Sequence, residues 1–167
     1  MRIRLAGFND LDDLYLMYKI AGDSLRAKGV NMWDSEYPDK EFIGEDIRKG
    51  EMLVVDDKEV PGGIAAAFVL TQDIIPGYEK ADWQYPDEPY VVLGRLCVNK
   101  DRQHRGLGSS IMDGIEESAR QDGTSVIKLD THKKNKEALD MYLHRGYKKR
   151  GSATWRGEDY FLLEKKL

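Results

Sequence analysis

A glycine turn near the middle of the chain has the composition of a phosphate-binding site. Residues 99–109 are NKDRQHRGLGS, and they separate an apolar run from a segment with helical periodicity. Gly106 and Gly108 permit backbone angles and a close approach that a side chain would prevent. The first N–H groups of a helix lack intrahelical partners and carry about half a positive charge, so a pyrophosphate suits such a turn. Alternatively, the two glycines only begin a helix, because short glycine motifs are weak evidence.

The side chains around this turn are mostly basic. The segment has one acidic residue, Asp101, and four basic ones, namely Lys100, Arg102, His104 and Arg105. This local basic charge contrasts with the net charge of -4 of the whole protein. The chain has neither GxxxxGK[ST] nor a complete GxGxxG, and the turn comes late in the sequence. A nucleotide triphosphatase loop is therefore absent, and a dinucleotide-binding fold fits poorly.

Cys97 is the only cysteine and lies in the apolar run before the turn. It could act as a nucleophile and form a covalent intermediate. A cysteine in a buried strand is more often an inert small apolar residue, and we favour that interpretation. One cysteine forms no internal disulfide and no cysteine-rich zinc site, and the three histidines have no ligand spacing, so no metal is expected.

The elements that would position these residues follow from apolar periodicity. The pattern predicts a single α/β domain over residues 1–167, with strands and helices alternating around a mixed sheet. In the last helix, Ala138, Leu139, Tyr142 and Leu143 are expected to face inward. Helices are predicted over about 11–28, 39–49, 105–121 and 135–144, and strands over about 2–5, 52–55, 63–71, 90–98, 126–129, 147–155 and 159–165.

Composition restricts the cellular compartment and the classes of partner that we expect for this protein. The acidic balance argues against a general nucleic-acid binder. No apolar run approaches the roughly 20 residues of a membrane span, and residues 1–10 lack the apolar stretch of a signal peptide. A cytoplasmic protein with no nucleic-acid or membrane partner is expected.

Three motifs in the right order resemble the GNAT acetyltransferase superfamily, most clearly over residues 90–150. The turn fits the family signature Q/R-x-x-G-x-G/A, and the strand before it fits L-x-V. A downstream segment fits N-x-x-A-x-x-x-Y-x-x-x-G-[FY]. The matching residues are Gln103, Gly106 and Gly108; Leu96 and Val98; and Asn135, Ala138, Tyr142, Gly146 and Tyr147.

The resemblance implies a three-layer fold, a co-substrate and a set of site residues. The fold has a central mixed, mostly antiparallel sheet of about six to seven strands with helices on both faces. Acetyl-CoA is the implied co-substrate. Asn135 would contact its pantetheine or orient the helix, and Tyr142 would act as the general acid that protonates the departing thiolate. The turn that would bind pyrophosphate comprises Gln103, His104, Arg105, Gly106, Leu107, Gly108 and Ser109, and the strand end beside the pantetheine, where an N–H would polarise the acetyl carbonyl, comprises Leu96, Cys97 and Val98.

The general base is the point at which this chain departs from the family. Many members place a carboxylate on the strand before the turn, but Gly94 and Arg95 occupy those positions here. A water chain could remove the proton instead. The alternatives chosen by location are Asp34, Glu36, Glu88, Asp130 and His132.

The acceptor is expected to be an amine of a small molecule or a peptide. Two segments that border the acceptor side in the family combine aromatic and acidic residues, which suits a cationic amine. Packed aromatics within solvated acidic loops are an equal alternative. Other interpretations are a non-catalytic acetyl-CoA sensor or a transferase of longer acyl groups, and a homodimer is compatible with the exposed strand edges. The residues concerned are Trp33, Tyr37, Trp83 and Tyr85, with Asp34, Glu36, Asp82, Asp87 and Glu88.

Overall fold

The computed structural model describes residues 1–167 as seven strands and four α-helices. The predicted order of elements is confirmed, and most ends agree within one or two residues. Short 3₁₀ turns, which the periodicity did not predict, occupy 8–10, 61–63, 78–80 and 100–102. The elements are β1 (Arg2–Leu5), α1 (Leu11–Ala27), α2 (Lys40–Arg48), β2 (Met52–Asp56), β3 (Ile64–Thr71), β4 (Tyr90–Val98), α3 (Leu107–Gln121), β5 (Val126–His132), α4 (Lys136–His144), β6 (Lys148–Trp155) and β7 (Glu158–Lys166).

The strands form one mixed sheet in the order β1-β2-β3-β4-β5-β7-β6. β1 pairs with β2, β2 with β3, β5 with β7 and β6 with β7, all antiparallel. β4 and β5 are parallel, as expected for strands joined through a helix. The mixed, mostly antiparallel sheet of the predicted three-layer fold is therefore confirmed.

The chain divides into two compact units. Unit 1 comprises residues 1–70 and 95–108, and unit 2 comprises residues 71–94 and 109–167. β3, β4 and α3 each run through a boundary between the units. The organisation as a single domain stays a prediction.

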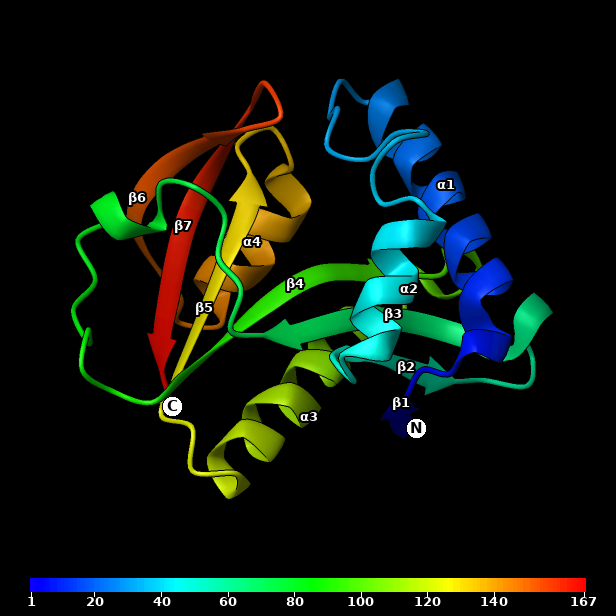
Figure 1. The fold of residues 1–167 in the computed structure, drawn as a ribbon, viewed down its shortest axis with the longest axis horizontal. Helices are drawn as coiled ribbons and strands as arrows, with labels where there is room; N and C mark the ends of the chain where they lie inside the picture. The colour runs from blue at the N-terminus through cyan, green and yellow to red at the C-terminus, as the bar shows by residue number, and fades with distance from the viewer. The chain divides into compact units, whose positions relative to one another are not determined.

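Unit 1 contains β1 to β3 and the two N-terminal helices. In Figure 1, α1 and α2 lie next to each other over β2 and β3. α1 buries Leu14, Met17 and Tyr18 on one face, which is the periodicity seen in the sequence. Asp39 caps α2 by accepting a hydrogen bond from the Phe42 N–H at 2.9 Å. The beginning of α2 is therefore fixed by its own cap, whereas α1 has no side-chain cap and is held through its buried face.

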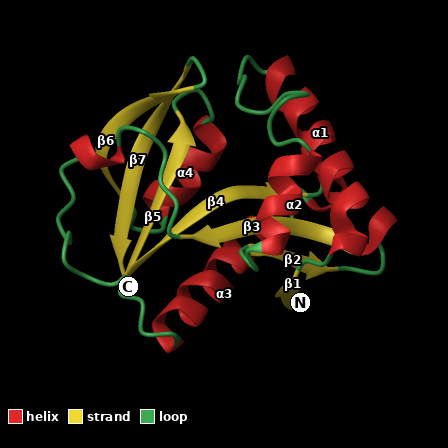
Figure 2. Cartoon of the chain, in the orientation of Figure 1, coloured by secondary structure: helices red, strands yellow, loops and turns green.

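Unit 2 contains β5, β7 and β6, with α4 against β5 (Figure 1). Its irregular segment, residues 72–89, is drawn as a long loop with one short helical turn in Figure 2. Tyr78 is fully buried there against Val92, Ala153 and Leu162. The Trp83 indole N–H donates to the Tyr78 carbonyl at 2.7 Å. Aromatic packing thus orders this segment along the sheet.

Two features of the helices differ from expectation. Leu143 is 39% exposed, so the prediction that it faces inward is wrong. It follows Tyr142, whose side chain takes the inward position near the end of α4. Glu116 is buried on the inner face of α3 among Met112, Ile115 and Ala119, because partners from other elements satisfy its charge.

No helix combines the length and apolar character needed to cross a bilayer.

Candidate functional site

β4 changes conformation before its last residues. Its parallel ladder with β5 ends at the Leu93–Leu129 pair, and β4 continues to Val98. Arg95 lies beyond this pair with a φ of 49°, in the left-handed region. An L-residue with a side chain adopts that conformation at a cost of about 1–2 kcal/mol. Other contacts must therefore hold the bend that precedes Leu96.

The Arg95 side chain forms a half-buried ion pair within unit 1. Its Nη2 is 2.5 Å from Asp46 Oδ2, and its Nη1 donates to Tyr37 Oη at 2.7 Å. Burial raises the pKa of Asp46, and the nearby guanidinium only partly opposes this effect. The Arg95 Nε is buried without a hydrogen-bond partner. The position that carries a carboxylate in many family members is thus a cation neutralised by α2.

Sequence reasoning did not identify Asp46 as part of the site. A usable signal was present, because Asp46 falls on the helical face that also buries Ile43 and Ile47. Arg95 likewise interrupts the apolar run of β4. A charged residue inside an apolar pattern is expected to be paired, and here the two interruptions pair with each other.

The chain after β4 is fixed to the neighbouring hairpin. The Asn99 N–H donates to the Ala65 carbonyl at 2.8 Å, and its side-chain amide donates to the Ile64 carbonyl at 3.1 Å. Gln103 Nε2 donates to the Val98 carbonyl at 3.0 Å. Arg102 Nε is 2.6 Å from Asp57 Oδ2, so this member of the basic cluster anchors the loop to the β2–β3 connection.

The glycine turn itself is open. Gly106 has a φ of 72°, and His104 has a φ of 61°. A Cβ added at Gly106 would find no atom within 4 Å. The exposed side chains of the turn are Gln103, His104, Arg105 and Ser109. The helix α3 begins at Leu107, which is half-buried rather than part of the core. The turn therefore presents main-chain groups and basic side chains at the beginning of a helix of 15 residues.

A cavity of about 370 Å³ borders the loop that leads into this turn. Its walls come from α1, the β2–β3 connection and the segment 99–103, all within unit 1. Leu16, Met17, Ile20 and Ile64 provide apolar surface, and Asp13 adds an acid. On this side, Lys100 and Gln103 thus face open volume rather than packed protein.

Cys97 is buried in β4. Burial raises the pKa of its thiol to about 12, so the thiolate is scarce at neutral pH. The thiolate is the nucleophilic form of cysteine. This environment favours the inert interpretation of Cys97.

Asn135 and Tyr142 both belong to unit 2 and to α4. Asn135 is the helix N-cap, and its Oδ1 accepts the Ala138 N–H at 3.4 Å. Tyr142 is 6% exposed and makes an edge contact with Tyr147, with ring centroids 5.6 Å apart. Burial, with a contribution from Asp130, raises the pKa of Tyr142, so its hydroxyl remains protonated and able to donate.

Known proteins share both the sequence pattern and this fold. The model of the acetyltransferase (GNAT) family matches residues 14–147. The chain belongs to this family. An uncharacterized N-acetyltransferase in the pepI 3' region of Lactobacillus delbrueckii subsp. lactis is 28% identical over 117 residues, covering 64% of this chain and 68% of that protein.

Solved structures show the same fold as this GNAT protein. A GNAT-family acetyltransferase from Streptococcus agalactiae 2603 matches with a TM-score of 0.87 at 22% identity, over 99% of this chain and 95% of that one. A chain of the NatC complex, solved with Gag peptide and CoA, matches with a TM-score of 0.69 at 13% identity, over 100% and 99%. Family membership therefore supports acyl transfer as the class of reaction.

Most base candidates named for this GNAT chain already have local partners. Asp34 Oδ1 accepts the N–H groups of Glu36 and Tyr37 at 2.8 and 2.9 Å, which closes a turn. Asp130 Oδ2 accepts the Tyr78 hydroxyl at 2.8 Å. Glu88 is bound by Ser125 and Lys166. These bonds give each of the three carboxylates a structural role.

His132 is engaged through both ring nitrogens. Its Nδ1 accepts the Lys134 N–H at 3.1 Å, and its Nε2 is 2.7 Å from Glu158 Oε2. A nitrogen that accepts cannot also carry the proton, so Nε2 carries it and donates to Glu158. The neutral ring therefore joins the end of β5 to the beginning of β7.

Two of the aromatic side chains proposed to bind the acceptor amine already contact lysine ammonium groups of this chain. The Lys128 ammonium is 4.5 Å from the Trp83 ring centroid, and the Lys166 ammonium is 5.1 Å from that of Tyr85. Lys166 also pairs with Glu88 at 2.6 Å. This half of the expected amine cleft is therefore occupied by lysines of unit 2 itself.

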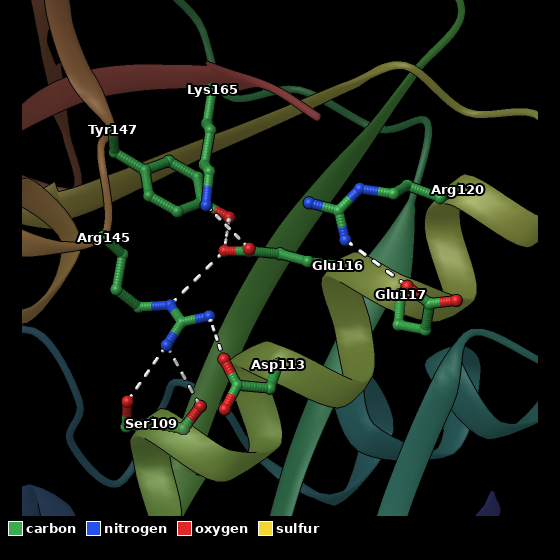
Figure 3. Close-up of polar contacts among 8 residues, drawn as sticks. All are labelled: Ser109, Asp113, Glu116, Glu117, Arg120, Arg145, Tyr147 and Lys165. Atoms are coloured by element: carbon green, nitrogen blue, oxygen red, sulfur yellow. Dashed lines mark hydrogen bonds and ion pairs between the residues drawn. The ribbon is translucent and has the colours of Figure 1, made fainter.

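A partly buried polar network connects α3 with the chain after α4 (Figure 3). Arg145 contacts Ser109 Oγ at 3.0 Å, Asp113 at 2.6 Å and Glu116 at 3.3 Å. Glu116 Oε2 also accepts from Lys165 at 2.7 Å. Arg145 follows the helix that carries Tyr142, so the network fixes this helix against the first turns of α3.

Proposed function

We propose that this protein transfers the acetyl group of acetyl-CoA to a primary amine of a small molecule or a peptide. Family membership supports acyl transfer. The observation that carries the donor assignment is the open turn at 103–108, where Gly106 is left-handed with free space around its Cβ position. A pyrophosphate suits N–H groups at a helix N-terminus beside basic side chains.

Residues of the glycine turn and of the end of β4 fit this donor. Main-chain groups of 103–109 would bind the pyrophosphate, and Arg105 is exposed beside them. Main-chain groups of Leu96, Cys97 and Val98 would lie beside the pantetheine, as the family motif implies. Acetyl-CoA supplies an activated thioester carbonyl, and an N–H of this segment would polarise its oxygen. Asn135 caps α4 in this proposal and orients it.

The proposed reaction is direct attack. The amine nitrogen bonds to the acetyl carbon, the carbon–sulfur bond breaks, and its electron pair leaves on sulfur. Tyr142 gives its proton to that sulfur, the attacking nitrogen loses a proton to water, and the Tyr142 phenolate then takes a proton back from solvent. A free thiol near pKa 8.5 is a stronger acid than tyrosine, so this transfer requires a site that also destabilises the thiolate.

The proposal also specifies that the donor is acetyl-CoA rather than a longer acyl-CoA. It further specifies that the protein is a catalyst rather than a sensor of acetyl-CoA. A sensor would need the turn but no acid, and Tyr142 is present, protonated and next to the α4–α3 network. The acceptor class takes support from the NatC chain, which was solved with a peptide and CoA. Of the unit 1 aromatic residues named for the acceptor, Tyr37 accepts a hydrogen bond from the Arg95 guanidinium at 2.7 Å.

Calorimetric titration with acetyl-CoA tests the donor site. The intact protein is expected to bind in the micromolar range, and Gly106→Glu is expected to abolish binding because it places a carboxylate where the pyrophosphate would lie. Gly106→Ala is the matched control, since it adds only the strain of a left-handed side chain, about 1 kcal/mol, in open space.

The control separates charge from backbone strain. Retained binding in Gly106→Ala with lost binding in a folded Gly106→Glu supports the site. No binding by the intact protein would remove the acetyltransferase proposal. Titration with longer acyl-CoA esters distinguishes the acyl group, and mass analysis of products from an amine panel identifies the acceptor.

A further inference from the structure

Arg95 is held in the left-handed region by contacts from two different helices. The Tyr18 hydroxyl, on α1, donates to the Arg95 carbonyl at 2.7 Å. Asp46, on α2, pairs with the guanidinium. Non-glycine residues keep such a conformation only where their surroundings determine it, and they concentrate at functional sites.

Tyr18 is itself rigidly placed. It is 1% exposed, and its ring meets Trp33 edge-on with centroids 5.1 Å apart. Its hydroxyl therefore reaches the Arg95 carbonyl from a fixed position. The carbonyl it holds belongs to the peptide that joins Arg95 to Leu96, so the hydrogen bond sets the orientation of the Leu96 N–H directly.

We propose that Tyr18 is a positioning residue that, together with the Arg95–Asp46 pair, orients the main-chain N–H of Leu96 toward the thioester carbonyl. This inference rests on the proposed function. Loss of the hydroxyl frees the peptide between Arg95 and Leu96 to leave its left-handed bend. The donor would still bind through the glycine turn, but its carbonyl would be less polarised.

Difference infrared spectroscopy with acetyl-CoA labelled with ¹³C at the carbonyl measures this polarisation without an acceptor. Binding to the intact protein is expected to move the carbonyl stretch to lower frequency. In Tyr18→Phe the shift is expected to fall to about half, while the calorimetric dissociation constant changes by less than about threefold. Tyr15→Phe, the same change on the same helix, is the control and is expected to retain the full shift.

The outcomes separate this inference from the proposed function. An unchanged carbonyl shift in a folded Tyr18→Phe protein would overturn the role of Tyr18. A bound donor with no shift in the intact protein would also overturn it, but would leave the coenzyme site in place. Absence of acetyl-CoA binding to the intact protein would overturn both proposals. A reduced shift in Tyr15→Phe as well would indicate general loosening of α1 and count against a specific role.

Discussion

At the scale of single residues, burial decides which side chains of this protein can react. Cys97 and Tyr142 are both buried, and burial raises the pKa of each. For the thiol this removes the nucleophilic form, whereas for the phenol it preserves the proton-donating form. The same physical effect thus removes the nucleophilic form of Cys97 and makes the Tyr142 phenol a weaker acid, so the proposed transfer from Tyr142 requires a strongly basic thiolate.

Replacement of Tyr142 by phenylalanine is expected to lower kcat by about a hundredfold, because it removes the proposed proton donor and keeps the ring contact with Tyr147. The acetyl-CoA dissociation constant should stay within about twofold, since the ring and the turn are unchanged. Steady-state kinetics and calorimetry measure the two quantities. An unaltered kcat would exclude Tyr142 as the acid.

Cys97 should make stability depend on alkaline pH. Its pKa is raised from 9.0 to about 12, so the folded protein holds this proton more tightly than the unfolded chain. The resulting stabilisation is complete below about pH 9 and is lost as pH rises through about 12, at about 1.4 kcal/mol per unit. Urea unfolding at pH 8 and pH 10.5 should show a larger loss for the intact protein than for Cys97→Ala. Equal losses would contradict the buried thiol.

At the scale of elements, α3 and α4 are joined by charges rather than by apolar packing alone. Arg145 and Lys165 both reach Glu116, whose side chain is almost fully buried (Figure 3). Removal of one partner from a buried charge is more costly than loss of an exposed pair. The helix that carries Tyr142 therefore depends on Arg145 for its attachment to α3.

Arg145→Gln is expected to lower the free energy of unfolding by about 2 kcal/mol, because Glu116 loses one of its two cations. Arg120→Gln is the control, since Arg120 forms an exposed pair with Glu117 on the same helix and should change stability by less than about 0.5 kcal/mol. Chemical denaturation measures the free energy of unfolding of both variants and of the intact protein. Equal effects would show that the network adds no more than a surface ion pair.

At the scale of the whole molecule, three continuous elements pass between the compact units. β3, β4 and α3 each contribute residues to both units, so separate unfolding would break two strands and a helix. We therefore expect the two units to unfold cooperatively, as a single domain would.

A tryptophan reporter in each unit tests this cooperativity. One variant keeps Trp33 of unit 1, and another keeps Trp83 of unit 2, with the remaining tryptophans changed to phenylalanine. After correction for each variant's stability by circular dichroism, each fluorescence midpoint is expected to coincide with its own circular dichroism midpoint. A reporter that departs from the circular dichroism transition would show that the units unfold independently.

The sequence by itself determined the order of elements, the family and the glycine turn. Apolar periodicity and glycine positions are local properties, so they placed α1 to α4 and most strands within one or two residues, although β5 extends three residues beyond its predicted end. The turn at 103–108 was predicted for the same reason, because its chemistry depends on backbone angles that Gly106 permits and on a helix that begins at once.

Only the tertiary structure decided which charged residues meet. Arg95 and Asp46 are 49 residues apart, and Glu116 and Lys165 are also 49 apart, so no local pattern pairs them. The same holds for Tyr18, whose periodic position predicts burial but not a hydrogen bond to a carbonyl 77 residues away. Pairing of buried polar groups depends on which elements pack together, and that information appears only once the chain has folded.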